Sequence, residues 1–195
     1  STDARAVELL DQRELPVREV WLELRDIEGV AQAIETLAVR GAPAIGIAAA
    51  YGLAAASHDF PSERDAYVRA CEAAIERLAR TRPTAVNLFH VLAQMRRDLA
   101  EFAASGRGVE QQQAHWVSFS VAHAHADLEM CLRMGAAGGS LIASARGVLT
   151  HCNTGALATA GFGTALGVIR RAWADGARFR VFADGHTVCA FADSI

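Results

Sequence analysis

The stretch GVLTHCNTGALATAGFGTALGVIRRAWADGARFRVFA, residues 147–183, decides the fold. Its first apolar run, 147–152, predicts a buried strand, and the residues 153–155 that follow predict a turn. Residues 156–173 predict a helix rich in small side chains, and the apolar run 178–183 predicts a second strand. Strand, helix and strand at this spacing are typical of a parallel, doubly wound α/β sheet.

Only three residues, 184–186, separate the second apolar run from a third one at 187–192. A crossover between parallel strands needs a dozen or more residues, usually including a helix. Either the last two runs form a hairpin, or residues that belong between them are missing from this chain. We therefore expect a Rossmann-like parallel-sheet domain, which in the second case is incomplete.

The first 135 residues predict a mainly helical domain, because apolar residues recur in them at helical spacing. Asp26 is suited to be the N-cap of one of these helices, and Ser62 with Asp65 resembles a capping box. Pro83 suits the first turn of a later helix.

The composition changes at residues 135–139, where we expect glycine-containing turns to end the helical part. We place a domain boundary near residue 138. Residues 1–138 are then a mainly helical N-terminal domain, and residues 139–195 a partial Rossmann-like α/β catalytic domain.

The composition excludes several classes of protein. The 195 residues are 52% hydrophobic and 21% charged, which excludes a disordered chain. All 19 basic residues are arginine, so the residues present cannot carry out lysine Schiff-base chemistry or supply the lysine of a phosphate-binding P-loop. The net charge of −3 gives no basic surface for nucleic acid or an anionic membrane, which favours a small-molecule partner.

The cysteines indicate reduced thiols rather than disulfides or a metal site. They stand at 71, 131, 152 and 189, with no Cys-x-x-Cys pair and no histidine at metal-ligand spacing. With no secretory leader in the sequence, we expect a cytoplasmic protein. The apolar run 42–56 is too short to span a bilayer.

Cys152 is the strongest candidate for a reactive side chain. It stands at the carboxyl end of the first predicted strand and before a predicted helix, where open α/β sheets bind their ligands. Backbone N–H groups at a helix start bind anions and lower the pKa of a thiol, so a phosphate would suit this site. Alternatively, Cys152 is a buried small hydrophobic residue and the glycines after it only allow close packing.

Two arginines stand at joints between predicted helices. Arg40 precedes Gly41, Ala42 and a proline-started helix, and Arg82 precedes a proline in the same way. A guanidinium beside unpaired N–H groups suits a phosphate. The alternative for each is a solvated arginine at a helix end.

Asp193 follows the run 187–192 and would emerge at the same sheet edge as Cys152. A carboxyl group there could act as a general acid or base. The alternative is an ordinary aspartate that ends a strand, and Asp184 competes for the same role.

Together, these segments resemble the methylthioribose-1-phosphate isomerase family, which shares its fold with the regulatory subunits of translation initiation factor 2B. The motifs that carry the resemblance are LLDQ at 9–12, TLAVRGAPAIGIAAAYG at 36–52, RPTAVNL at 82–88 and LTHCNTG at 149–155.

The resemblance implies an aldose–ketose isomerase of methionine salvage that converts 5-methylthioribose 1-phosphate into 5-methylthioribulose 1-phosphate without a metal or other cofactor. It implies that the catalytic residues are Cys152 and Asp193, and that the substrate-binding residues are Arg40, Gly41, Ala42 and Arg82. It also implies a homodimer.

Two other functions stay open at this point. One is isomerisation of a related sugar phosphate, ribose 1,5-bisphosphate or 5-deoxyribose 1-phosphate. The other is a non-catalytic regulatory subunit like those of initiation factor 2B. The resemblance also implies that a segment between Asp184 and Gly185 has been lost, which agrees with the short connection noted above.

Overall fold

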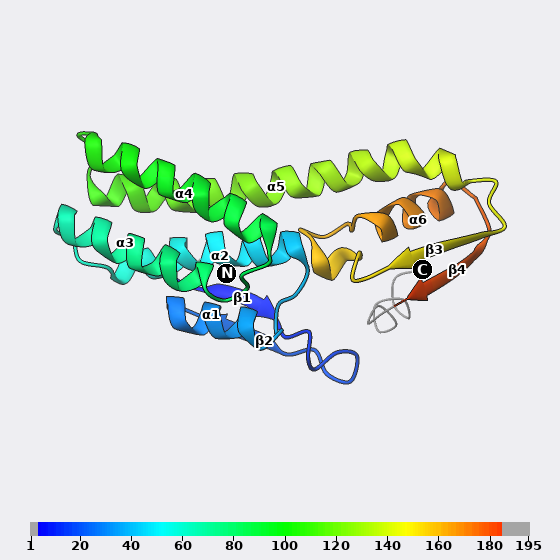
Figure 1. The fold of residues 1–195 in the computed structure, drawn as a ribbon, viewed down its shortest axis with the longest axis horizontal. Coiled ribbons are helices and arrows are strands. Elements are labelled where there is room, and N and C mark those ends of the chain that lie inside the picture. Colours follow the sequence, from blue (N-terminus) through cyan, green and yellow to red (C-terminus); the bar gives the residue numbers. More distant parts are fainter. Residues whose placement is uncertain (1–3, 185–195) are drawn as a thin grey trace. The chain divides into compact units, whose positions relative to one another are not determined.

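The structure is a computed structural model that describes residues 4–184 (Figure 1). It divides into two compact units, the first ending at His123 and the second beginning at Ala124. This division falls inside one long helix. The domain boundary near residue 138 stays a prediction.

The first unit is an antiparallel pair of strands with a group of helices (Figure 1). Its elements are β1 (Val7–Leu10), β2 (Trp21–Leu24), α1 (Ile27–Glu35), α2 (Ala42–Ala56), the 3-10 turn η1 (Ser57–Asp59), α3 (Arg64–Ala79), α4 (Val86–Ala104) and the first part of α5 (Val109–Ile142).

The prediction of a mainly helical N-terminal part is confirmed, but it missed the two strands. They pair with Val7 opposite Leu24 and Leu10 opposite Trp21. Each strand is only four residues long and a ten-residue connection separates them, so neither gives a clear alternating pattern.

The predicted helix start is confirmed at one helix and is wrong at two others. The Asp26 carboxylate accepts a 2.7 Å hydrogen bond from Gly29 N–H at the start of α1, as predicted. The N-cap of α3 is Glu63 rather than Ser62, because the Glu63 carboxylate accepts from both Asp65 and Ala66 N–H. Pro83 lies in a turn before α4, which begins at Val86.

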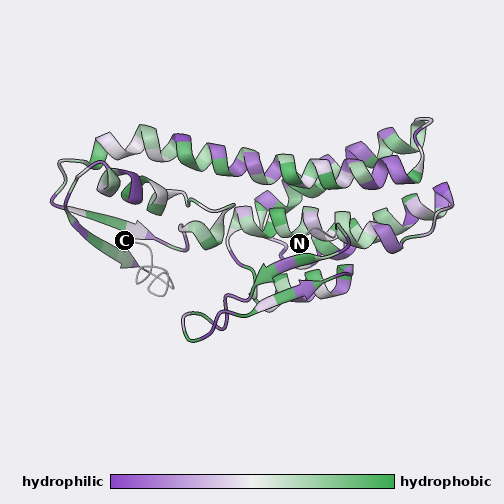
Figure 2. Ribbon diagram, turned by 180° about the vertical axis from the view of Figure 1, so that it is seen from behind, coloured by the Kyte–Doolittle hydropathy of each residue, from purple (hydrophilic) through white to green (hydrophobic). Residues whose placement is uncertain are grey.

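The core of the first unit surrounds α2. This helix is apolar on all sides, and Figure 2 colours it green to white along most of its length. One face each of α3 and α4 packs around it, and the buried residues of these faces include Tyr67, Cys71, Ile75, Leu78, Leu88, Leu92, Met95, Leu99 and Phe102. The predicted helical stripes are therefore the faces that form the core.

The second unit is a small strand–helix–strand layer. It contains the rest of α5, β3 (Gly147–His151), the 3-10 turn η2 (Ala156–Ala158), α6 (Ala165–Ala174) and β4 (Arg180–Asp184). The strands are parallel, and α6 packs on one face of the pair through Leu166 and Ile169 against Val148 and Val181. The predicted α/β arrangement is confirmed for these two strands. The third predicted strand, 187–192, lies outside the described residues.

Two predictions about the second unit were wrong. Residues 135–139 continue α5 instead of forming turns, because their glycines let α6 approach the helix. A Cβ on Gly138 would lie 2.8 Å from Val168, and a Cβ on Gly139 would lie 3.2 Å from Arg171. The predicted helix 156–173 is also shorter than expected, since the glycine-containing segment between η2 and α6 is a loop.

Close packing of α2 on α1 predicts a measurable cost for a single methyl group. A Cβ on Gly52 would lie 2.8 Å from Val30, so Gly52→Ala should lower the free energy of unfolding by about 1–3 kcal/mol. The measurement is urea denaturation.

Gly29→Ala is the matched control, because Gly29 is also helical but its Cβ would meet neighbours only at 3.4 Å. This variant should gain up to about 1 kcal/mol from helix propensity. Adding Val30→Ala to Gly52→Ala should restore part of the loss. Equal effects of the two alanine substitutions would contradict the packing argument.

Candidate active site

The first part of the candidate site is the joint before α2. Gly41 is the N-cap of α2. Its φ is +107°, a backbone conformation that residues other than glycine rarely adopt. Pro43 lies in the first turn of the helix, as its position in the sequence predicts. Immediately before this turn, the Arg40 Nε is buried and has no hydrogen-bond partner among the described residues. A buried N–H without a partner is costly, so this group suits an anionic ligand.

The second part is the joint before α4. Arg82 is half-buried, and its carbonyl accepts a 3.0 Å hydrogen bond from Ala85 N–H in the turn that leads into the helix.

The starts of α2 and α4 lie against each other. A Cβ on Gly46, in the early part of α2, would be 3.3 Å from the carbonyl oxygen of Asn87 at the start of α4. The two helices are also extensively packed side by side. The positive ends of both helix dipoles therefore meet at one end of this pair, near the arginine that precedes each helix.

The four residues predicted to bind substrate stand in the chain at or just before these two helix starts: Arg40, Gly41 and Ala42 at the start of α2, and Arg82 four residues before α4. Helix starts and guanidinium groups are both chemically suited to a phosphate, so the predicted phosphate site stays a candidate at these joints.

Cys152 lies directly after β3, at the carboxyl end of the strand. It is exposed, so the alternative of a buried hydrophobic cysteine is wrong. Its φ of +68° is left-handed, and its N–H donates a 3.2 Å hydrogen bond to the Asp184 carbonyl on β4. A non-glycine residue in this conformation is strained by about 1–3 kcal/mol, and such residues cluster at functional sites.

The expected helix start after Cys152 is not immediately next to it. Only the three-residue turn η2 follows, and α6 begins at Ala165. The intervening loop nevertheless folds back, because Thr164 N–H donates a 2.9 Å hydrogen bond to the Thr154 carbonyl. Gly163 is required there, since it has φ +95° and a Cβ on it would lie 2.8 Å from the same carbonyl oxygen. The start of α6 is thus beside the turn that carries Cys152.

Three further side chains hold this loop, and reasoning from the sequence missed their roles. Asp127 on α5 is buried and accepts a 2.8 Å hydrogen bond from Ala160 N–H. The Thr159 hydroxyl accepts hydrogen bonds from Gly161 and Gly163 N–H. Thr150 on β3 is buried and bonds to the Thr154 hydroxyl at 3.0 Å. Asp127 is far from the loop in the sequence, and no local pattern identifies it.

Acidic groups at the sheet edge are only partly described. Asp184 ends β4 opposite His151, and its carboxylate lies 3.2 Å from the His151 Nδ1. Both side chains are well exposed. Asp193 lies outside the described residues, so its predicted role stays a prediction.

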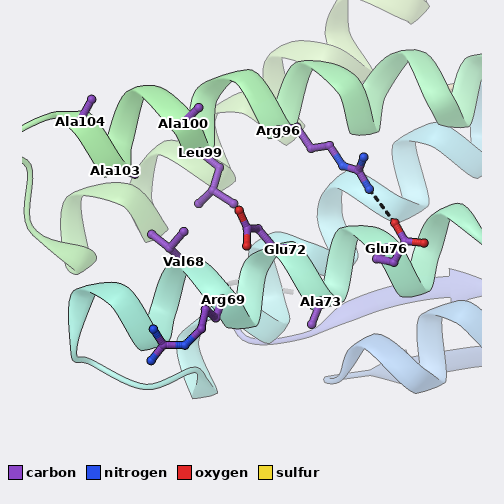
Figure 3. A pocket seen from close by; sticks show the side chains of 10 residues that line it. All are labelled: Val68, Arg69, Glu72, Ala73, Glu76, Arg96, Leu99, Ala100, Ala103 and Ala104. Carbon is purple, nitrogen blue, oxygen red and sulfur yellow. Dashed lines mark hydrogen bonds and ion pairs between the residues drawn. The ribbon is translucent and has the colours of Figure 1, made fainter.

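A groove between α3 and α4 contains none of the predicted site residues (Figure 3). Its volume is about 990 Å³, and its walls combine alanines with two acidic residues and two arginines. Arg96 is paired there with Glu76 at 2.8 Å, as the dashed line in Figure 3 marks. Charge in this groove is therefore balanced.

Within residues 4–184, three or more His, Cys, Asp or Glu side chains do not come together in a group that could hold a metal ion. Over the same residues, the helices include none that is both long and apolar enough to cross a membrane.

Comparison with known proteins identifies relatives over most of the chain. A methylthioribose-1-phosphate isomerase of Syntrophotalea carbinolica is 47% identical over 91% of this chain and 52% of its own length. A protein of the same name from Xanthomonas oryzae is 49% identical over 91% of this chain and 49% of its own.

Two solved structures are also similar. The 5-methylthioribose 1-phosphate isomerase of Pyrococcus horikoshii matches with a TM-score of 0.81 and 35% identity, covering 90% of this chain and 49% of that one. The delta subunit of translation initiation factor eIF-2B from A. fulgidus matches with a TM-score of 0.75 and 38% identity, covering 92% of this chain and 53% of that one.

The chain spans about half the length of the curated relatives it matches. Residues 38–186 match the pattern of the initiation factor 2 subunit family. This match includes the joint before α2, the joint before α4 and the turn with Cys152. The chain belongs to the initiation factor 2 subunit family.

Proposed function

We propose that the intact protein is an aldose–ketose isomerase that converts 5-methylthioribose 1-phosphate into 5-methylthioribulose 1-phosphate. The observation that carries this proposal is the agreement between curated relatives and a solved structure, which bear the same enzyme name and cover about nine-tenths of the chain. The chemistry of the described site is compatible with it, because the starts of α2 and α4 offer donors for a sugar phosphate.

In this proposal the substrate phosphate binds at the starts of α2 and α4. The guanidinium groups of Arg40 and Arg82 neutralise its charge, and the backbone N–H groups of Gly41 and Ala42 donate to its oxygens. These contacts hold the phosphate in both the substrate and the product, so they mainly contribute to binding affinity.

Asp193 and Cys152 carry the chemistry in this proposal. The Asp193 carboxyl group protonates the ring oxygen, and the bond between that oxygen and C1 breaks. The Cys152 thiolate removes the proton from C2, so a C1–C2 double bond forms. The thiol then returns a proton to C1, while the C2 hydroxyl gives its proton back to Asp193 and becomes a ketone. No atom is gained or lost.

A regulatory role is the second candidate, because the initiation-factor subunit from A. fulgidus matches almost as well as the isomerase structure. A regulator would bind a sugar phosphate or nucleotide without needing a reactive thiol. The exposed, strained Cys152 followed by a glycine-containing loop favours the enzyme. We further propose that the intact protein is a cytoplasmic homodimer.

Replacing either catalytic residue should abolish turnover. In the intact protein, Cys152→Ala and Asp193→Asn should each lower kcat by about 10²–10⁴-fold, because each removes a proton-transfer group. Phosphorus and proton NMR would measure conversion of 5-methylthioribose 1-phosphate, with the two related sugar phosphates as alternative substrates.

Binding of the substrate should persist in both variants, since neither residue is placed at the phosphate. Wild-type turnover by one variant would remove that residue from the mechanism. Turnover in deuterated water tests the proton route: deuterium at C1 supports proton transfer through a thiol that exchanges with solvent. Full retention of the C2 hydrogen is the result expected either for a hydride shift or for return of the same proton by the Cys152 thiol.

Differences in thiol burial predict selective alkylation. Cys152 is exposed, whereas burial raises the pKa of Cys71 to about 12 and also raises the pKa of Cys131. Because the thiolate is the reactive form, iodoacetamide should modify Cys152 well before these two in the folded protein. Peptide mass spectrometry measures the rates. All three thiols should react alike in denaturant, and comparable rates in the folded protein would contradict the described burial.

A further inference from the structure

We propose that Asp11, Arg13 and Thr36 form a clamp that positions Arg40 for phosphate binding, so that Arg13 is a positioning residue of the site. This inference rests on the proposed function, in which Arg40 binds the substrate phosphate. We call these three residues the Arg13 clamp.

The clamp is built on a buried carboxylate. Asp11 follows β1 and has only 3% of its surface exposed. Its two oxygens accept hydrogen bonds of 2.8 and 2.6 Å from the Arg13 Nε and Nη2, and one of them also accepts from Arg13 N–H at 3.0 Å. The guanidinium lowers the pKa of the Asp11 carboxyl, which keeps it ionised. A bidentate pair of this kind fixes the orientation of the arginine.

The third nitrogen of the Arg13 guanidinium, Nη1, reaches the end of α1, just before the loop that leads to Arg40. It donates a 3.0 Å hydrogen bond to the Thr36 hydroxyl at the end of α1. The same hydroxyl donates to the Gln32 carbonyl at 2.7 Å, so it is already oriented by its own helix.

A second connection holds the loop two residues further on. Gln12 N–H, between the two charged residues of the clamp, donates a 2.9 Å hydrogen bond to the Ala38 carbonyl. The segment after β1 therefore holds the loop at Thr36 and again at Ala38, on both sides of Leu37.

Leu37 needs this support, because its φ of +64° is left-handed. Helices commonly end with glycine in this conformation, and a larger L-residue there is strained. Leu37 is also 41% exposed, so core packing of its side chain alone does not hold it. The two connections from the segment after β1 stabilise the strained turn.

The position of Arg40 follows from this turn. Ala38 and Val39 are buried, and Val39 N–H donates to the Ala33 carbonyl at 3.1 Å. Only these two residues separate Leu37 from Arg40, whose Nε is the buried donor without a partner. Releasing the turn would let Arg40 move away from the start of α2, and phosphate affinity would fall while the chemistry at Cys152 would not change.

The test compares Thr36→Val with Thr36→Ser in the intact protein. Valine removes the acceptor for Arg13 at similar size, and it should raise the KM for 5-methylthioribose 1-phosphate by about tenfold, as expected for loss of a charge-assisted hydrogen bond. Serine keeps the hydroxyl and should stay within about twofold of wild type. In both variants kcat should change little.

Arg13→Lys is the second clamp variant, because lysine keeps the charge but cannot form the bidentate pair. It should raise KM in the same way, and it serves if Thr36→Val does not fold. Arg18→Gln is the control, since Arg18 lies in the same segment but its guanidinium pairs with Glu14 at the surface. It should leave KM unchanged.

Calorimetric titration with inorganic phosphate separates this inference from the proposed function. If the wild type binds phosphate but does not turn over the sugar phosphate, the function fails, and weaker phosphate binding by the clamp variants still supports the clamp. Unchanged phosphate affinity in Arg13→Lys and Thr36→Val would overturn the clamp. Parallel losses of kcat, affinity and thermal midpoint would overturn it as well, since they indicate a merely structural role.

Discussion

Two glycines let α2 lie directly against its neighbours, and the rest of the first unit depends on that contact. Gly52 meets Val30 of α1, and Gly46 meets the backbone of α4 at Asn87. A larger side chain at Gly46 would separate the starts of α2 and α4. The two helix dipoles and the two arginines would then no longer share one end, so the same close packing that forms the core also assembles the candidate phosphate site.

Each unit has a strained backbone residue at or near its candidate functional residue. Among residues 4–184, the non-glycine residues with a positive φ are Leu37 and Cys152. The first lies three residues before Arg40, and the second is the proposed catalytic thiol. A hydrogen bond to a neighbouring segment holds each of them. Gln12 N–H donates to the Ala38 carbonyl, next to Leu37, and Cys152 N–H donates to the Asp184 carbonyl. A strained residue persists only where its surroundings determine its conformation, which is the property that a preorganised site requires.

Periodicity and local chemistry predicted the presence and order of the long elements and the start of α1 at Asp26. The α3 and α4 stripes are the buried faces, and β3, α6 and β4 follow the predicted order. The errors arose where tertiary packing outweighs local preference. Glycines 135, 138 and 139 suggest turns in isolation, but they stay helical because α6 packs on them. Strands β1 and β2 are stabilised by pairing across a ten-residue gap, and the roles of Asp127 and Arg13 depend on partners that no local pattern reveals.

Similarity of fold does not separate an isomerase from a regulator in this family, since the two solved relatives match at 35% and 38% identity with TM-scores of 0.81 and 0.75. Helix starts that bind an anion are compatible with either role, because that property comes from packing and dipoles rather than from a reactive group. Catalysis adds a requirement that binding does not have: a nucleophilic or basic side chain that is accessible and held in one orientation. Cys71 and Cys131 are buried, with pKa values raised by that burial, and neither meets this requirement. Cys152 is exposed at a strand end, and its left-handed conformation is held by the hydrogen bond to Asp184. This difference among the three thiols within residues 4–184 supports the proposal of an enzyme.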